Sequence, residues 1–447
     1  MTRQTRFNGL TAAVLLVCSA FLPGCGPGRQ QAENFTVAAV PAALVEGQVK
    51  VWSWNTAAKS LQALTPAFEK QDPHVRVSVD MTGARMQTRL MLSLIAGVGA
   101  PDVSQLFSTD APHYIATGRL TDLTSVAAKY RSQFPPALWA DCTLHGRVYA
   151  IPWDIGPCAV YYKRSLFRKY GIDPAKIETW ADYIAAGQQI VQRSGGRTKM
   201  LALGPNDLQA LFEILIQQTG GQVFDGQGHI AVDSPQTRQA LAVIRQMRQA
   251  GICSDVPAYS QEWMAGFSGD SLATYPSAVW LAGTIKDTAG DYAGRQGDWG
   301  VFRLPAVVPG GLRVANSGGS VLVIPSESQN KAAAWAFIEY ALCTRAGQSA
   351  QYQNFDLFPA FLPALTAPAF DQPDPFFGGQ RVARLFATDV SKIPPLNRTA
   401  SWAEASGYLS QDLSHWAATG MPEGDILAPL AQKLSSRLDV PVAAGGG

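Results

Sequence analysis

Aromatic side chains that stand next to carboxylates or amides are the residues of this chain best suited to chemistry. Trp54 precedes Asn55, Trp153 precedes Asp154, and Trp280 lies in the segment TYPSAVWLAG. The apolar C–H face of a neutral sugar ring packs on an indole, while carboxylates and amides form hydrogen bonds with its hydroxyls. These residues therefore predict a carbohydrate-binding surface, with packing in a protein core as the commoner role of any single tryptophan.

The sequence lacks the short motifs of the common catalytic and metal sites. None of the five histidines stands in H-E-x-x-H or another metal-ligand spacing, and there is no G-x-S-x-G, Walker A or G-x-G-x-x-G motif. We therefore expect no enzyme, no metal and no other cofactor. A pair of carboxylates for glycoside hydrolysis is the alternative left open, because the fold and not the sequence sets their spacing.

The first half of the chain alternates between strand and helix, which would hold such side chains at the edge of a sheet. Residues 48–55, 75–79 and 102–107 have the composition and alternation of strands, and apolar residues at helical spacing fill the intervals. Pro66 should kink or divide the first of these helices. The alternation predicts a mostly parallel sheet with helices on both faces, which binds ligands beyond the carboxyl ends of its strands.

The carboxyl ends of the first and third strands carry three candidate ligand residues. Trp54 and Asn55 end the first strand, and Asp110 lies in the loop after the third. Asp110 has an alternative role as a helix N-cap, because it precedes Ala111 and Pro112 and proline favours the first helical turn. The sequence alone leaves both roles open.

The second half of the chain contains sequence signals for several helix starts and for one buried strand. Thr179 and Asp182 have the spacing of a capping box, and Ser234 followed by proline opens another helix. Asp207 is expected to cap a third helix. Residues 320–324 predict a buried strand, so this half also has an α/β pattern.

The composition is that of a well-packed protein too long for one ordinary core. Of 447 residues, 47% are hydrophobic and 16% are charged, which predicts two lobes or domains. Without residues 1–24 the basic and acidic residues would be equal in number. Neither nucleic acid nor an acidic membrane surface is therefore an expected partner, and a neutral small molecule fits better.

The N-terminus has the pattern of an export signal over residues 1–24, with two arginines before an apolar stretch. The letters LPGC that end at Cys25 resemble the lipobox of bacterial lipoproteins, in which the cysteine is acylated and becomes the mature N-terminus. We expect Cys25 to be a lipid anchor. A plain cleaved signal peptide is the alternative, because proline departs from the motif. Residues 25–47 lack periodicity and predict a flexible tether.

Four further cysteines lie far apart, and no C-x-x-C pair suggests a zinc site. Cys142 and Cys158 could form a disulfide in an oxidising compartment. Four reduced, buried thiols are the equal alternative, and the pairing of Cys253 with Cys343 is open as well.

Five segments occur in an order that is similar to one known family. They are VWSWNTAAKSLQALTPAFEKQDPHVRVSVD, LMLSLIAGVGAPDVSQL, GRVYAIPWDIGPCAVYYKRSLFRKYGID with IETWADYIAAGQQI, GDSLATYPSAVW, and VANSGGSVLVIPSESQNKAAAWAFIEYAL. In this order they resemble the extracellular solute-binding proteins of ABC importers, in the branch that serves oligosaccharides and related sugars. The similarity runs from about residue 49 to about residue 365, and onward to Leu438.

The resemblance implies a two-lobe α/β fold of the periplasmic-binding-protein type II, with a mostly parallel sheet flanked by helices in each lobe. It implies an N-lobe made of residues 48–153 and 303–358 and a C-lobe made of residues 154–302 and 359–440. Residues 441–447 would be a disordered tail. The stretch VYAIPWDIGPCAVYY would be a crossover between lobes, in which two prolines stiffen a turn.

Carried over residue by residue, the resemblance implies a ligand site between the lobes. Its members would be Trp54, Asn55, Asp110, Trp153, Asp154, Trp280, Gly318 and Gly319. Trp280 would be a stacking plate on the second lobe, and the glycines would offer backbone N–H groups. The alternatives place Trp153 in the hinge core, make Asp154 a turn former and reduce the glycines to a tight turn. Arg398 and Trp263 are secondary candidates.

The leading functional hypothesis is a lipid-anchored extracytoplasmic receptor that closes around a sugar and passes it to the transmembrane subunits of an ABC permease. Such a receptor would be a monomer that touches the membrane through its N-terminal lipid only. One alternative is a receptor for a non-sugar polar solute, such as a polyol phosphate or a peptide. The other is a secreted glycoside-acting enzyme.

Overall fold

The computed structural model describes residues 36–37, 45–83, 85–289 and 297–444. The predicted export signal and the predicted lipid anchor Cys25 lie outside the described residues. Within the described ranges, no helix combines the length and the apolar character that crossing a membrane requires.

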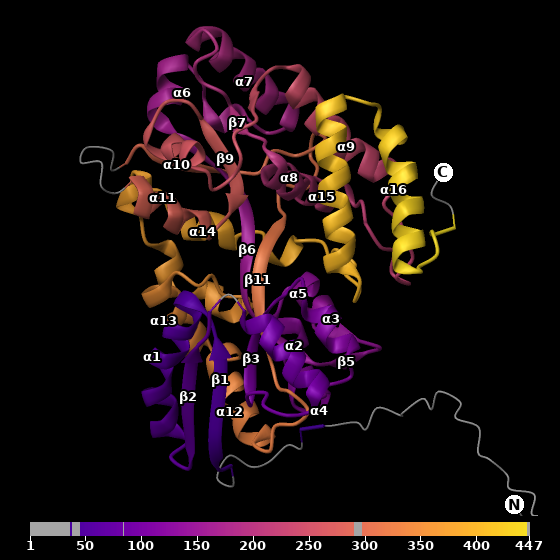
Figure 1. Cartoon of the computed structure of the whole chain (residues 1–447). Helices are drawn as coiled ribbons and strands as arrows, with labels where there is room; N and C mark the ends of the chain where they lie inside the picture. Colours follow the sequence, from indigo (N-terminus) through magenta and orange to yellow (C-terminus); the bar gives the residue numbers. More distant parts are fainter. Residues whose placement is uncertain (1–35, 38–44, 84, 290–296, 445–447) are drawn as a thin grey trace, which may run out of the picture. The chain divides into compact units, whose positions relative to one another are not determined.

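The first lobe carries the parallel strands expected from the first half of the chain (Figure 1). Its elements are β1 (Gly47–Ser53), α1 (Asn55–Gln71), β2 (Val75–Met81), α2 (Met86–Ala96), β3 (Val103–Phe107), α3 (Ala111–Ala116), α4 (Thr124–Ala127), α5 (Pro136–Asp141), β4 (Thr143–Leu144), β5 (Arg147–Val148), α12 (Lys331–Leu342) and α13 (Arg345–Phe355). Strand β1 pairs in parallel with β2 and β3. Helix α1 includes Pro66 without a break in its range, so the proline does not divide it.

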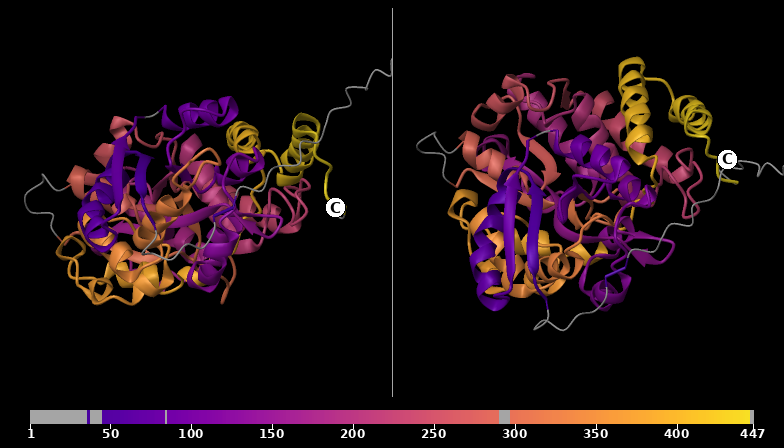
Figure 2. Two further views of the ribbon diagram at one scale, coloured as in Figure 1. Left: turned by 90° about the horizontal axis from the view of Figure 1, so that it is seen from below. Right: turned by 60° about the horizontal axis from the view of Figure 1, so that its bottom comes forward.

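The second lobe is richer in helices, and α15 and α16 lie side by side in it (Figure 2). Its elements are α6 (Arg164–Tyr170), α7 (Trp180–Ser194), β7 (Leu201–Ala202), α8 (Pro205–Thr219), α9 (Pro235–Gln249), β8 (Cys253–Ser254), α10 (Gln261–Ser268), β9 (Thr274–Ala278), α11 (Leu281–Ala289), β10 (Trp299–Arg303), α14 (Val382–Ala387), α15 (Trp402–Thr419) and α16 (Glu423–Leu438). The capping box of Thr179 and Asp182 and the Ser234 cap are present as predicted. The Asp207 cap is not, because Gly204 occupies the N-cap of α8.

Two antiparallel strands, β6 (Ala150–Lys163) and β11 (Asn316–Val323), connect the lobes (Figure 1). The sheet runs in the order β10-β6-β11-β3-β1-β2, and β9 also pairs with β6. The first half of β6 pairs with β11, whereas its second half pairs with β9 and β10. A single strand therefore passes from one lobe into the other.

The predicted turn at the centre of VYAIPWDIGPCAVYY does not exist. Strand β6 continues through Pro152 and Pro157, opposite two register shifts in β11. Proline cannot donate to a neighbouring strand, and the side chain of Asn316 takes up part of the pairing by accepting a hydrogen bond from the backbone N of Gly156 at 2.9 Å. The irregular pairing lets the strand keep its two prolines.

The expectation of a mostly parallel sheet in each lobe is confirmed for the first lobe only. Around β6 the second lobe is antiparallel, with β9 and β10 as partners, and its parallel pair is the short β7–β8. The α/β alternation of the first half does not extend to these strands, which follow longer helical insertions and return beside β6 in the opposite direction. The mixed α/β class itself holds.

Several lobe boundaries lie at other residues than the sequence predicted. Residues 304–315 still pack on the second lobe, where Gln218 donates to the carbonyls of Pro305 and Leu312, both at 3.0 Å. The chain therefore returns to the first lobe within β11 and not at residue 303. Phe361 lies 5.4 Å from Phe134 of the first lobe, ring centre to ring centre, which places the last crossing after residue 359.

Both predicted flexible ends contain residues that pair with the folded part. Val37, inside the predicted tether, is buried and donates its backbone N–H to the carbonyl of Asp122 at 3.2 Å. Ile230 donates to the carbonyl of Pro441 at 2.9 Å and accepts from Ala443 at 2.8 Å, so the predicted tail is ordered to at least that residue. These two segments pair through their backbones and have no apolar periodicity. Their contacts could therefore not be predicted from composition.

The four described cysteines are free thiols: Cys142, Cys158, Cys253 and Cys343. This arrangement agrees with the alternative of reduced side chains and contradicts a Cys142–Cys158 disulfide. Burial raises the pKa of each of these thiols, so the reactive thiolate form is disfavoured.

Candidate functional site

The carboxyl ends of β1 and β3 in the first lobe are held together by a glutamine that the sequence analysis did not select as a candidate. Gln105, buried on β3, accepts hydrogen bonds through Oε1 from the Ser53 hydroxyl at 2.6 Å and from the Trp54 backbone N at 3.2 Å. The ring of Trp54 lies 4.8 Å from that of Phe107, and Phe107 is 48% exposed. Asn55 is exposed and begins α1 with φ 49°. The ends of β1 and β3 thus present an aromatic pair beside a polar edge.

Asp110 occupies the predicted N-cap position of α3, but its side chain makes no capping hydrogen bond. Burial raises the pKa of Asp110, while the neighbouring Gln87 amide and the charge of His113 lower it. Two residues earlier, the buried hydroxyl of Ser108 has no hydrogen-bond partner among the described residues. Both polar groups therefore remain available beside the ends of the strands.

Asp154 lies where β6 meets β11 and is held by a single residue of the facing strand. Its Oδ1 accepts hydrogen bonds from the backbone N of Ser320 at 2.8 Å and from the Ser320 hydroxyl. Burial raises the pKa of Asp154, and the two Ser320 bonds lower it. The carboxyl group is thus positioned by the strand pairing, which excludes its alternative role as a turn former.

Gly318 and Gly319 bring β11 close to β6 and to Trp280. Their φ angles are 89° and 112°, a region that residues with a side chain rarely adopt. A Cβ on Gly319 would come within 2.8 Å of the Asp154 carbonyl oxygen, so the close approach requires glycine. The Trp280 Nε1 donates to the Ser317 carbonyl at 3.0 Å, and 43% of the residue is exposed. Asp154, the two glycines and Trp280 are therefore brought together.

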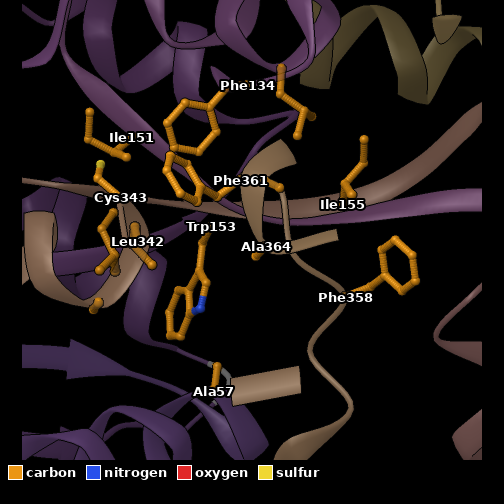
Figure 3. Packing of buried hydrophobic residues seen from close by; sticks show 14 of the residues in the cluster. Ala57, Phe134, Ile151, Trp153, Ile155, Leu342, Cys343, Phe358, Phe361 and Ala364 are labelled. Atoms are coloured by element: carbon orange, nitrogen blue, oxygen red, sulfur yellow. The ribbon is translucent and has the colours of Figure 1, made fainter. Parts of the chain in front are cut away.

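Trp153 is not part of this arrangement, although it precedes Asp154 in the chain. It is 1% exposed, and its Nε1 donates to Gln351 Oε1 at 2.6 Å. Figure 3 shows its ring inside the apolar cluster that includes Phe361 and Leu342. Successive side chains of a strand point to opposite faces, so the neighbours Trp153 and Asp154 cannot both face one ligand. The alternative of a hinge-core tryptophan describes its position.

A cavity of about 250 Å³ opens on the second lobe beside Trp280. Its wall includes residues of α8, of the segment before α10 and of β9, together with Ser317 of β11. Asp207 is its single charged lining residue in the described part of the chain, and burial raises the pKa of Asp207 to about 7. Trp263, a secondary candidate, is buried in the same wall.

Tyr259 covers part of this cavity in an unusual backbone conformation. Its φ is 63°, it is 61% exposed, and its ring centre lies 5.2 Å from that of Trp263. A bulky residue at positive φ is rare and is retained mainly at functional positions. Tyr259 and Asp207 are ligand candidates that the sequence reasoning missed, because nothing in the local pattern marks Tyr259 and the position of Asp207 predicted a helix cap.

A second cavity of about 730 Å³ also has Trp280 in its wall. It is lined by Thr56 and Lys59 of the first lobe and by residues of α11 and the segment around Pro373. Trp280 belongs to the walls of both cavities. The two spaces therefore adjoin a single exposed indole.

Arg398, the other secondary candidate, lies in neither cavity wall. It forms an ion pair with Asp141 at 2.8 Å and stacks 5.0 Å from the Trp402 ring centre. No group of histidine, cysteine or carboxylate side chains in the described ranges has the geometry of a metal site. The residues brought together are suited to hydrogen bonding and stacking against a neutral, hydroxyl-bearing molecule.

Comparisons with known proteins agree on one group. The family model for bacterial extracellular solute-binding proteins matches residues 52–348. The chain is 23% identical over 320 residues to the arabinooligosaccharide-binding protein of Halalkalibacterium halodurans, covering 70% of this chain and 71% of the relative. It is 26% identical over 369 residues to the lactose-binding protein of Rhizobium radiobacter, covering 78% and 84%.

A solved structure has the same fold. The sugar-binding protein MalE from the phytopathogen Xanthomonas citri aligns with a TM-score of 0.76 at 23% identity, covering 88% of this chain and 98% of that chain. Both consist of two α/β lobes, which confirms the fold class expected from the sequence.

Proposed function

Because this chain belongs to the bacterial extracellular solute-binding protein family, we propose that it is a receptor that binds a sugar or short oligosaccharide and delivers it to an ABC importer. The observation that carries the sugar part is the exposed indole of Trp280, which lines two cavities, together with the carboxyl group of Asp154 that Ser320 holds. An indole face and a fixed carboxyl group match the two kinds of surface that a sugar presents. The names of the arabinooligosaccharide-binding and lactose-binding relatives support the same substrate class.

The ligand of this receptor would be longer than one ring. The cavity beside α8 is smaller than the roughly 300–1,000 Å³ of typical small-molecule pockets. The second cavity, which also has Trp280 in its wall, adds a larger space. We infer that one ring occupies the smaller cavity, a second ring packs on Trp280, and further rings extend into the larger cavity.

The proposed receptor contacts this ligand through Trp54, Asn55, Asp110, Asp154, Trp280, Gly318 and Gly319, with Asp207, Tyr259 and Ser108 as additions. It works without turnover of the sugar. We also propose that it is a monomer anchored through an acylated Cys25 on the outer side of a membrane, where the transmembrane subunits of its importer lie.

A thermal-shift panel of maltose, lactose, arabinobiose and arabinotriose tests the proposal, because a ligand that binds the native state raises the melting temperature. We expect at least one of these sugars to raise the melting temperature and to be recovered intact by chromatography. Recovery of a cleaved product would instead indicate a glycoside-acting enzyme. A panel without any shift, repeated by calorimetry without heat of binding, would contradict the sugar class.

A further inference from the structure

Strand β2 forms one end of the large sheet and leaves one of its own edges open. Among the described strands it pairs with β1 alone, and Figure 1 shows it at the margin of the first lobe beside α1. An open edge presents N–H and C=O groups with which a further strand can form hydrogen bonds. Such an edge is therefore a docking surface unless other groups already occupy its N–H and C=O groups.

The direction of the backbone groups of β2 follows from the bonds on either side of the strand. The carbonyl of His74 accepts a hydrogen bond from the backbone of β1 at 3.2 Å, and the N–H of Thr82 donates one to it at 2.8 Å. The even-numbered residues therefore bond to β1. Because successive residues of a strand direct their backbone groups to opposite sides, the groups of Val77 and Val79 point to the open edge.

Two side chains of α1 form hydrogen bonds with these edge groups. Glu69 Oε1 accepts a hydrogen bond from the Val77 N–H at 2.9 Å, and Gln62 Nε2 donates one to the Val79 carbonyl at 3.0 Å. An ionised carboxylate only accepts and an amide nitrogen only donates, so each side chain matches the backbone group that it meets. The two side chains thus make the bonds that the backbone of an added strand would make.

The sequence of β2 is complementary to itself. If two copies pair in antiparallel fashion about a two-fold axis at Ser78, Val77 of one copy lies opposite Val79 of the other. The backbone groups of both valines point to the edge, so this is the hydrogen-bonded type of pair. Arg76 of one copy would lie opposite Asp80 of the other, and opposite charges across a pair of strands are stabilising. The best-matched partner for this edge is therefore a second copy of the same strand.

We propose that the edge of β2 is a docking surface for a second copy of this chain, and that Gln62 and Glu69 keep it closed. The two-fold pairing needs the Val77 N–H and the Val79 carbonyl, which these two side chains already bond. Dimerisation must therefore break both bonds in each copy, and this opposing cost keeps the chain a monomer. Residues 75–81 are absent from the walls of both cavities beside Trp280, so this surface is independent of the proposed sugar site.

The first test removes the two side chains from the full chain and measures its mass by sedimentation velocity over a range of concentrations. We expect a monomer for the wild type. Gln62→Ala combined with Glu69→Ala should form a reversible dimer, with a dissociation constant at least about tenfold lower than that of the wild type. Glu69→Gln keeps an acceptor oxygen and should remain a monomer. Lys70→Ala is the matched control, because Lys70 is the exposed neighbour of Glu69 on α1.

A cysteine at the two-fold axis tests the register. Residues opposite each other in a non-hydrogen-bonded pair have Cα atoms about 4.5 Å apart, which is within the roughly 4.4–6.8 Å that a disulfide spans. Ser78 is exposed, so Ser78→Cys in the double variant should form a disulfide between copies on oxidation, located by mass spectrometry of peptides. Arg76→Cys in the same variant is the control, because the two copies of this residue would lie about 14 Å apart along the strands.

Each outcome decides one part of the proposal. A double variant that stays a monomer at every concentration would overturn the docking surface, and so would a disulfide that forms through Arg76→Cys but not through Ser78→Cys. A wild type that dimerises as strongly as the double variant would show that Gln62 and Glu69 do not close the edge. Both of these residues lie at the surface of α1, so we expect every variant to keep a melting temperature close to that of the wild type.

Discussion

Arg398 and Asp141 form an ion pair between the two lobes, with 2.8 Å between the guanidinium Nη1 and the carboxylate Oδ2. Their side chains are 6% and 1% exposed. Asp141 ends α5 in the first lobe, and Arg398 precedes α15 in the second. Burial raises the pKa of Asp141 to about 6, while the charge of Arg398 and its hydrogen bond lower it. Close by, His113 Nδ1 lies 3.0 Å from the carbonyl oxygen of Ala400, so the lobes touch through polar groups away from both cavities.

Breaking this pair on one side should destabilise the protein strongly. Asp141→Asn removes the carboxylate that bonds a buried guanidinium, and breaking a buried pair on one side costs about 3–5 kcal/mol. The double variant Asp141→Leu with Arg398→Met should cost less than either single change, because it removes both desolvated charges together. Urea unfolding of the three variants measures the difference. Equal costs that simply add would show that the two side chains do not interact.

Loss of the exposed indole should weaken sugar binding without unfolding the protein. Trp280→Ala removes the ring surface shared by both cavities, and we expect at least a tenfold loss of affinity, on the order of 1.4 kcal/mol. Tyr408→Ala on α15, outside both cavity walls, is the control and should bind as the wild type does. Calorimetry with the sugar that gives the largest thermal shift provides the measurement. Unchanged affinity of Trp280→Ala would remove this residue from the site.

The carboxyl group of Asp154 should matter more than the hydroxyl that holds it. Asp154→Ala removes the hydrogen-bonding group, and we expect at least a tenfold loss of sugar affinity. Ser320→Ala keeps the backbone N–H that bonds Asp154 at 2.8 Å, so its loss should be smaller, about two- to fivefold. The same titrations check both variants. A larger loss for Ser320→Ala than for Asp154→Ala would contradict this ranking.

Glycine should be required at residue 319 for steric reasons. Gly319→Ala places a Cβ 2.8 Å from the Asp154 carbonyl oxygen at φ 112°, which should cost about 1–3 kcal/mol of stability. Gly407→Ala in α15 is the control, because a Cβ there meets nothing within 4 Å and alanine favours a helix by about 0.5–1 kcal/mol. Thermal unfolding should therefore shift in opposite directions for the two variants. A shift in the same direction would exclude crowding at Gly319.

Lipid anchoring should depend on one side chain. Cys25→Ser removes the thiol that would be acylated, so the protein should move from the membrane fraction to the soluble fraction of its host. Fractionation followed by immunoblotting measures this distribution. Continued membrane association of the variant would show that another segment or a partner holds the protein there.

The sequence predicted the helices and strands better than it predicted the directions in which their side chains point. Caps such as Thr179 and strands such as β1 follow from local residue preferences, which act before any packing. The directions of Trp153 and Asp154 depend on which face of β6 packs against the first lobe, and only pairing with a distant strand decides that. Asp207 has the residue type of a cap, yet Gly204 starts the helix and frees its carboxyl group for the cavity. Long-range pairing and cavity shape are thus what the local pattern does not contain.

The continuity of β6 has a mechanical consequence. A strand that belongs to both lobes is part of the hinge, because rotation of one lobe against the other must twist or bend this strand together with β11. Residues on the strands that connect the lobes move least during such a rotation. The distance between Asp154 and Gly319 would therefore stay the same at any angle between the lobes. Trp54 and Tyr259, far from these two strands in the sequence and on separate elements, would travel farther. Residues farther from these strands would therefore move relative to Asp154 and Gly319, whose positions stay fixed.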